Sequence, residues 1–168
     1  MRVVVVPGTL ALLPEYASID DPIPDLRKAV VDAVAWLLDD GPAAVVVGSP
    51  GARRIAVHLL GPDGWDPSGH GLLVVGNGSA TRTEKAPGHL DDRAAAFDAA
   101  VREALTAGDP AALGNIDLGL ADELWALPDA DVLRGLAERV DRVTEAQVDY
   151  DDAPYGVQYW VVRWQCGS

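Results

Sequence analysis

Three short apolar runs constrain the fold of this chain more than any other feature of its sequence. They cover residues 3–6, 43–47 and 72–75, and each is followed by glycine or by Pro-Gly. Runs that are this short, apolar throughout and closed by glycine are typical of strands buried on both faces of a sheet. Between the first two runs, apolar residues from Leu26 to Leu38 recur at helical spacing. Strand, helix and strand in this order predict a parallel, right-handed βαβ unit.

The other segments predict further helices and a pair of C-terminal strands. A strong helical pattern runs from Leu90 to Leu105 and stops at Gly108. The remaining expected elements are a strand over 54–60, a loop over 61–71, a broken helix over 110–127, a helix over 132–140 capped by Asp129 or Asp131, and strands over 142–150 and 156–164. The sequence therefore predicts one α/β domain over residues 1–168, in which three layers hold a mostly parallel sheet, helices on both faces and an antiparallel C-terminal element.

The charge of the chain excludes some classes of partner. Asp and Glu number 26 and Lys and Arg 13, so the formal net charge is -13. Binding to nucleic acid or to an anionic membrane requires a basic face, and we expect neither partner. No apolar run reaches the length of a membrane span. The single cysteine, Cys166, cannot form an internal disulfide, which favours a cytoplasmic protein.

Candidate functional residues gather where the predicted strands end. In open α/β sheets, ligands bind beyond the carboxyl ends of the strands. Gly8 and Ser49 follow the first two runs, and the third leads into a polar loop from Gly76 to Lys85. The sequence therefore predicts a pocket at this edge, whose candidate residues are Gly8, Ser49, Asn77, Ser79, Arg82, Glu84 and Lys85.

Common local motifs do not fit this loop well. Gly76-Asn77-Gly78 begins like a dinucleotide-binding fingerprint, but the third glycine and the following helix are lacking. Neither Ser49 nor Ser79 lies in a Gly-x-Ser-x-Gly nucleophile motif. A small anion or nucleotide held by backbone N–H groups, Ser79, Arg82 and Lys85 is one alternative. The other interpretation is that Arg82, Glu84 and Lys85 form a solvated network of charges.

Two longer stretches of the sequence resemble a known enzyme family. They are GHGLLVVGNGSATRTEKAPGHLDDRAAAFDAAV at 69–101 and DYDDAPYGVQYWVVRW at 149–164, and VVVVPGTLALLPE at 3–15 adds a weaker likeness. The chain is thereby similar to the B-type subunits of class III extradiol ring-cleavage dioxygenases, in particular to a short, diverged actinobacterial-type branch of that family. The resemblance covers both ends of the chain and leaves the middle unassigned.

The resemblance implies a scaffold from which parts of the catalytic site are missing. Active members of the family cleave catechol-type rings with ferrous iron held by two histidines and a glutamate, while a further histidine acts as acid and base. The resemblance puts Gly8 at the position of a histidine ligand and Ala80 at that of the acid/base histidine. It puts Glu123 at the position of the glutamate, which makes Glu123 the eighth candidate residue of the pocket. Glycine and alanine side chains neither bind iron nor transfer a proton. We therefore expect no catalytic residue, no cofactor and a binding or assembly module whose small-molecule ligand is unknown.

A relocated metal site is the alternative that keeps an enzymatic function. It would use His70 or His89 together with Glu123 or Asp91 and would hold Fe(II) if the family's activity survives. The histidines do not show the close pairing of known metal motifs. The simpler interpretation is that they are ordinary surface or core residues.

The C-terminal segment is rich in aromatic residues. On a strand, Tyr159 would face one side of the sheet, and Trp160 and Trp164 the other. We expect the two tryptophans to lie in the core beneath a helix. The alternative is an exposed aromatic patch that binds a second copy of the chain, giving a homo-oligomer, or a partner protein.

Overall fold

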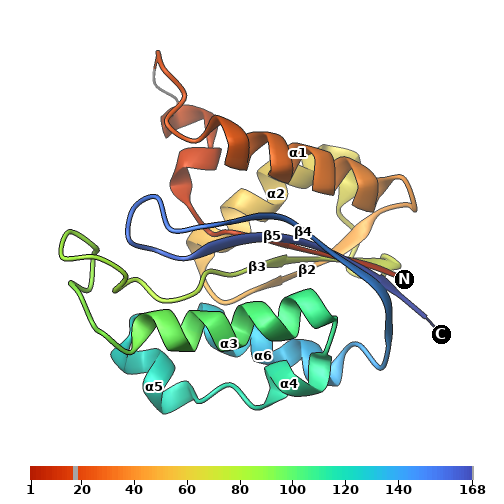
Figure 1. Ribbon diagram of the computed structural model, residues 1–168. Helices are drawn as coiled ribbons and strands as arrows, with labels where there is room; N and C mark the ends of the chain where they lie inside the picture. Colours follow the sequence, from red (N-terminus) through yellow and green to blue (C-terminus); the bar gives the residue numbers. More distant parts are fainter. Residues whose placement is uncertain (17–18, 168) are drawn as a thin grey trace.

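A five-stranded sheet forms the middle layer of the computed structural model, which describes residues 1–16 and 19–167 (Figure 1). Its strands are β1 (Arg2–Val6), β2 (Ala43–Val47), β3 (Gly71–Val75), β4 (Val143–Asp152) and β5 (Tyr159–Cys166), in the spatial order β2-β3-β1-β5-β4. The strands β2, β3 and β1 are mutually parallel, whereas β5 pairs antiparallel with both β1 and β4. This arrangement confirms the predicted α/β fold class and its antiparallel C-terminal element.

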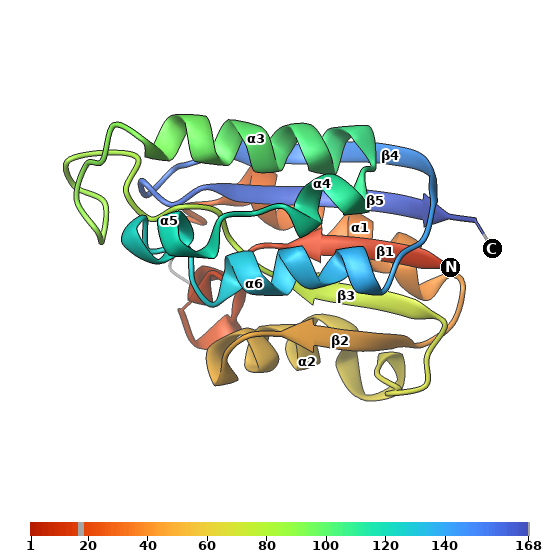
Figure 2. The ribbon, with the colours of Figure 1, turned by 90° about the horizontal axis from the view of Figure 1, so that it is seen from below.

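Helices cover both faces of the sheet (Figures 1 and 2). One face carries α1 (Pro24–Leu38), α2 (Pro50–Gly64) and the short 3₁₀ turns η1 (Leu10–Leu12) and η2 (Pro14–Tyr16). The other carries α3 (Ala94–Ala107), α4 (Pro110–Gly114), α5 (Leu118–Glu123), α6 (Asp129–Arg134) and the turn η3 (Gly135–Glu138). No helix in the described part of the chain is long and apolar enough to cross a membrane.

The valines of β1 show why an apolar run forms a central strand. Val3 and Val5 belong to the core beneath α3 to α6, while Val4 and Val6 belong to the core beneath α1 and α2. Alternate side chains of a strand point to opposite faces, so both faces of a central strand must be apolar. All four valines are almost fully buried.

The aromatic strand β5 is buried on both faces. Trp160 and Trp164 are fully buried and belong to the core on the α3 side, and the Trp164 Nε1–H donates to the Leu105 carbonyl oxygen at 2.8 Å. Tyr159 faces the other core. The core prediction is therefore confirmed. Tyr159, Trp160 and Trp164 therefore form no exposed patch, because β5 lies between β1 and β4 with helices on both sides.

The prediction of a strand over residues 54–60 is wrong, because this segment lies within α2. Its buried residues Ala52, Ile55, Ala56 and Leu60 follow a helical period. The Ser49 side chain caps the helix by accepting the Ala52 N–H at 3.1 Å. The helix kinks at Gly61, so the predicted loop begins only after Gly64.

Candidate functional site

The carboxyl ends of β1, β2 and β3 lie at one edge of the sheet, as the sequence predicts. Val6, Val47 and Val75 are the last residues of these strands and pair in register through β3. Because β5 is antiparallel to β1, it begins near the same edge, and β4 ends opposite its start. The loops that follow β1 and β3 are therefore brought next to the β4–β5 connection.

Gly8 is fixed at this edge by a chain of hydrogen bonds. Its N–H donates to Asn77 Oδ1 at 2.8 Å, and the Asn77 N–H donates to Asp129 Oδ2 at 3.0 Å. Asp129 lies in the first turn of α6. Burial raises the pKa of its carboxyl group, and the hydrogen bond from Asn77 opposes this rise. The position where the resemblance expects a histidine ligand is thus a backbone link between β1, β3 and α6.

A second group of polar residues surrounds the carboxylate of Asp98, and we call Ser79, Arg82, Asp98 and Gln158 the Asp98 cluster. The Ser79 N–H donates to Asp98 Oδ1 at 2.8 Å, and the Ser79 hydroxyl donates to Oδ2 at 2.6 Å. Arg82 Nη1 donates to Asp98 Oδ2 at 3.3 Å and to Gln158 Oε1 at 2.8 Å. Ser79, Asp98 and Gln158 are buried, and Arg82 is partly buried.

The Asp98 carboxylate occupies the place that an external anion would take in this loop. Burial raises the pKa of Asp98, while the hydrogen bonds from Ser79 and Arg82 oppose the rise. The sequence assigned backbone N–H groups, Ser79, Arg82 and Lys85 to a bound anion. Lys85 is exposed, and the remaining donors seen near Asp98 are the Ser79 N–H, the Ser79 hydroxyl and the Arg82 guanidinium. All three bind Asp98 instead. This geometry disfavours anion or nucleotide binding by the loop.

Backbone bonds join the Asp98 cluster to the start of β5. The Gly78 N–H donates to the Gln158 carbonyl oxygen at 2.8 Å, and the Gln158 N–H donates to the Ser79 carbonyl oxygen at 2.9 Å. A Cβ atom added at Gly78 would lie 2.6 Å from both Asp98 Oδ1 and Trp160 Cη2. Only glycine therefore fits at this crossing of loop, helix and strand.

The polar network continues towards the surface. Gln158 Nε2 donates to Asp151 Oδ1 at 2.8 Å, and Arg102 Nη1 donates to Asp151 Oδ2 at 3.1 Å. A small polar cavity of about 310 Å³ lies here, between α3 and the β4–β5 connection. Its polar lining groups are mostly engaged with one another.

The other predicted pocket residues have structural roles or lie in solvent. Ser49 caps α2. Ala80 is buried, and its N–H donates to the Leu124 carbonyl oxygen at 3.0 Å. Glu84 and Lys85 are exposed. The structure thus brings together Gly8 with Asn77 and Ser79 with Arg82, while Glu84, Lys85 and Ser49 lie apart from both pairs.

The residues of the alternative metal site do not meet. Glu123 is exposed and accepts a bond from Arg93 Nη1 at 2.6 Å. His70 directly precedes β3, whereas His89 lies in the loop beyond its carboxyl end and contacts the Glu84 carbonyl oxygen. Asp91 pairs with Arg93 at 2.7 Å, and this contact lowers the Asp91 pKa to about 2. In residues 1–16 and 19–167, no three His, Cys, Asp or Glu side chains are grouped to hold a metal ion.

The sequence patterns do not predict Asp98 or Asp129 as residues of this edge. A signal for Asp98 exists, because it follows Ala94 by four residues and so falls on the inward stripe of the predicted helix. A carboxylate on such a stripe must find donors inside the protein. Asp129 was expected only as a helix cap; the N-cap of α6 is Pro128, and the Asp129 carboxylate bonds Asn77.

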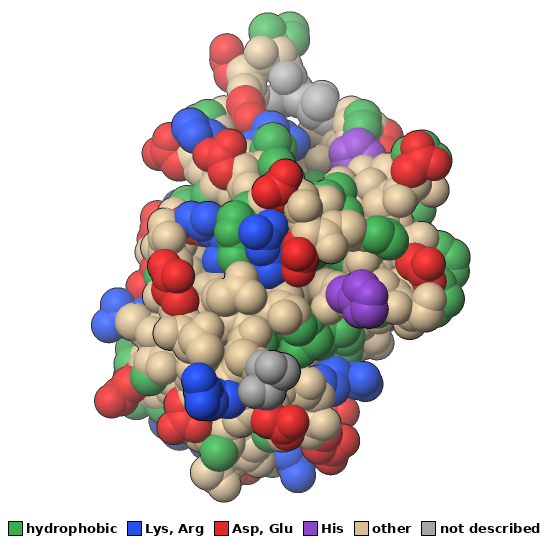
Figure 3. All heavy atoms as spheres, turned by 90° about the vertical axis from the view of Figure 1, so that its right-hand side faces the viewer, with side chains coloured by type: hydrophobic (Ala, Val, Ile, Leu, Met, Phe, Trp, Pro, Cys, Tyr) green, Lys and Arg blue, Asp and Glu red, His purple; other side chains and the backbone are tan. Residues whose placement is uncertain are grey.

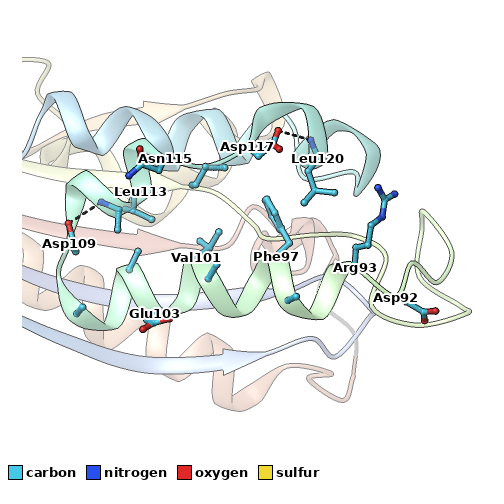
Figure 4. Close-up of a pocket in the computed structure, with 16 residues that line it drawn as sticks. Asp92, Arg93, Phe97, Val101, Glu103, Asp109, Leu113, Asn115, Asp117 and Leu120 are labelled. Atoms are coloured by element: carbon cyan, nitrogen blue, oxygen red, sulfur yellow. Dashed lines mark hydrogen bonds between the residues drawn. The ribbon is translucent and has the colours of Figure 1, made fainter.

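A separate hollow lies on the outer layer, between α3 and the segment formed by α4 and α5 (Figure 4). Its volume is about 960 Å³. We call it the α3–α5 groove, and its main apolar lining residues are Phe97, Ala100, Val101, Leu113, Ile116 and Leu120. It is far more apolar in lining than the cavity beside Asp98.

Basic side chains do not form a continuous patch on the face shown in Figure 3, where they are scattered among acidic ones.

Comparisons with known proteins give no assignment. No protein-family model matches the sequence, and no curated protein matches it significantly. The likeness to the extradiol dioxygenase family therefore rests on the sequence stretches alone.

Proposed function

We propose that this chain is a non-catalytic binding module on a scaffold that resembles the class III extradiol dioxygenases. The proposal is supported by the contacts of the residues at the three positions where the resemblance expects catalytic groups. Gly8 donates its N–H to Asn77, Ala80 is buried with its N–H bound to Leu124, and Glu123 pairs with Arg93 in solvent. Each of these positions serves the fold or the surface instead of a reaction.

The residues around Gly8 do not fit ferrous iron. Iron of this enzyme type requires two imidazoles and a carboxylate on one face. A side chain at position 8 would begin 3.6 Å from Asn77 Nδ2 and 3.8 Å from Asp129 Oδ2. The neighbours are thus the apolar Val75 side chain at 3.5 Å, one amide and one carboxylate, and the carboxylate already accepts the Asn77 N–H. We derive no reaction step through a metal at this edge.

Binding would then use the α3–α5 groove. Ligand and partner sites are commonly concave and apolar, with a few polar groups at their border. The groove has this character. The edge of the sheet at which β1, β2 and β3 end, which we call the carboxyl edge, is instead closed by hydrogen bonds within the chain. As part of the same proposal, we assign the module to the cytoplasm, because its single cysteine offers no internal disulfide.

An assay of ring cleavage tests the non-catalytic part of the proposal. The purified protein is incubated anaerobically with ferrous iron and then mixed with catechols and dioxygen, and the coloured cleavage product is followed by absorbance. We expect the rate of an iron-only blank. Cleavage that depends on folded protein, and is lost after heat denaturation, would contradict the proposal.

A further inference from the structure

We propose that the α3–α5 groove binds an amphipathic helix of a partner protein, with the apolar face of that helix inside the groove and basic side chains along its border. This inference rests on the proposed binding function and names the partner's chemistry. It does not depend on the carboxyl edge or on the absence of iron chemistry.

The walls of the groove provide apolar contacts from two sides. Figure 4 shows Phe97 and Val101 of α3 pointing towards the gap, and Leu113 and Leu120 of the opposite segment pointing back towards α3. Phe97, Val101 and Leu113 are largely buried and form the floor, while Leu120 is only half-buried. An apolar occupant would therefore extend the existing core.

The shape of the α3 wall favours a helix as the occupant. The lining residues on α3 include Ala96, Ala100, Ala104 and Ala107, which succeed one another every three or four residues. Small side chains at this spacing allow the axis of a second helix to come close, as in helix packing at about 8–10 Å. The wall from Ala96 to Ala107 is about 16 Å long, or three helical turns.

The border of the groove selects a basic partner. Asp92, Glu103, Asp109 and Asp117 all line it. Arg93 is the one Lys or Arg among the described lining residues, and it is ion-paired with Asp91 and Glu123. The border is therefore negative, and complementary charge requires Lys or Arg on the flanks of the bound helix.

The same charges disfavour a second copy of the chain. In a symmetric dimer, the same surface of both copies forms the contact. The acidic border of one groove would then face its equivalent, between two molecules that each carry a net charge of -13. Like charges so placed repel, which leaves a basic partner as the favoured occupant.

Fluorescence anisotropy with a labelled peptide tests this proposal. The probe is a 15-residue amphipathic helical peptide of leucine, alanine and lysine; a scrambled peptide of the same composition and a peptide with glutamate in place of lysine are its controls. We expect only the probe to bind, with affinity that falls as salt is added. A probe that does not bind at about 100 μM, roughly the weak limit for a useful peptide contact, overturns the proposal. Equal binding of the acidic peptide overturns it as well.

Two variants of α3 test whether the peptide binds in the groove. Ala100→Gln puts a longer neutral side chain into the groove, and we expect the affinity for the probe to fall about tenfold. Ala99→Gln is the matched control, since Ala99 is also exposed on α3 but lines the polar cavity instead. Equal weakening by both variants contradicts the assignment. Circular dichroism of both variants checks that they are folded.

Sedimentation velocity separates the partner helix from self-association. We expect the protein to be a monomer at the concentrations used with the peptide. A dimer that Ala100→Gln dissociates, and that competes with the probe, would show that a second copy fills the groove and would overturn the proposal. None of these results changes the outcome of the ring-cleavage assay, so a failure of this inference can be told apart from a failure of the proposed non-catalytic function.

Discussion

Asp98 connects parts of the chain that are far apart in the sequence. Its carboxylate takes hydrogen bonds from Ser79 in the loop after β3 and from Arg82, which also binds Gln158 at the start of β5. Such a buried carboxylate is tolerated only because each oxygen has donors. Its role here is to hold the loop, the helix α3 and the C-terminal strand together.

Replacement of Asp98 by alanine tests this role. The variant Asp98→Ala leaves the Ser79 N–H and the Arg82 guanidinium without their buried acceptor. We expect the free energy of unfolding to fall by about 3 kcal/mol, as for other broken buried ion pairs. Urea denaturation measures the change.

The exposed acid Asp141 gives a matched control for this variant. Asp141→Ala is expected to change stability by less than about 0.5 kcal/mol. A similar small effect for Asp98→Ala would mean that the Asp98 cluster contributes little to the fold.

The pH dependence of stability gives a further test of Asp98. Burial raises its folded-state pKa above the ordinary value of 3.8. The folded protein then binds a proton at Asp98 more readily than the unfolded chain does, so protonation of Asp98 stabilises the folded state. This stabilisation is complete below the unfolded pKa and is lost as pH rises through the folded pKa. The stability lost in Asp98→Asn should therefore be larger near pH 4 than at pH 7, as measured by urea denaturation at both values. A loss of stability that grows with pH would show that the hydrogen bonds from Ser79 and Arg82, and not burial, determine the direction of the Asp98 pKa shift.

At the scale of elements, the pattern of buried apolar residues determines which strands and helices can be predicted from the sequence. The strands β1, β2 and β3 could be predicted because they are apolar on both faces and followed by glycine or Pro-Gly. Residues 54–60 of α2 predict a strand from their sequence alone, because the segment before Gly61 is short and contains Ile55 and Val57, which favour strands. Its capping Ser49 and the helical period of its buried residues are the signals that decide in favour of a helix.

The sequence predicts where the candidate residues gather on the sheet, but it predicts only some of the residues that lie there. Strand order brings Gly8, Asn77, Ser79 and Arg82 to the same edge, as loops after parallel strands require. The partners of these residues could not be predicted, because Asp98 comes from α3 and approaches them only when the helix packs on the sheet. The site therefore depends on tertiary packing that local patterns do not contain.

Two glycine substitutions test the close packing between elements. In Gly78→Ala, the new Cβ would lie 2.6 Å from Trp160 and Asp98 atoms, and we expect a loss of about 3 kcal/mol from overpacking. Gly135 has helical backbone angles and no heavy atom within 4 Å of an added Cβ. Gly135→Ala should therefore raise stability by about 0.5 kcal/mol. Thermal unfolding of both variants measures the difference, and equal melting temperatures would contradict the packing at Gly78.

At the scale of the whole molecule, α3 separates two regions of different character. Its inward side carries Asp98 and the apolar core, while its outer alanines line the α3–α5 groove. The carboxyl edge is closed by internal hydrogen bonds, and the groove remains open. The molecule is thus an α/β scaffold with a hydrogen-bonded edge at the ends of β1 and β3, and its outer layer carries the groove that we propose as the binding surface.

Iron content is the measurement that tests this account most directly. The protein is incubated anaerobically with ferrous iron, excess metal is removed by gel filtration, and iron per chain is determined by elemental analysis. We predict a stoichiometry near zero for the wild type and also for the Gly8→Ala variant, in which a methyl group fits beside Asn77 and Asp129 without supplying a ligand. About one iron per wild-type chain would contradict the account, because it would require a metal site that the residues at the carboxyl edge do not form.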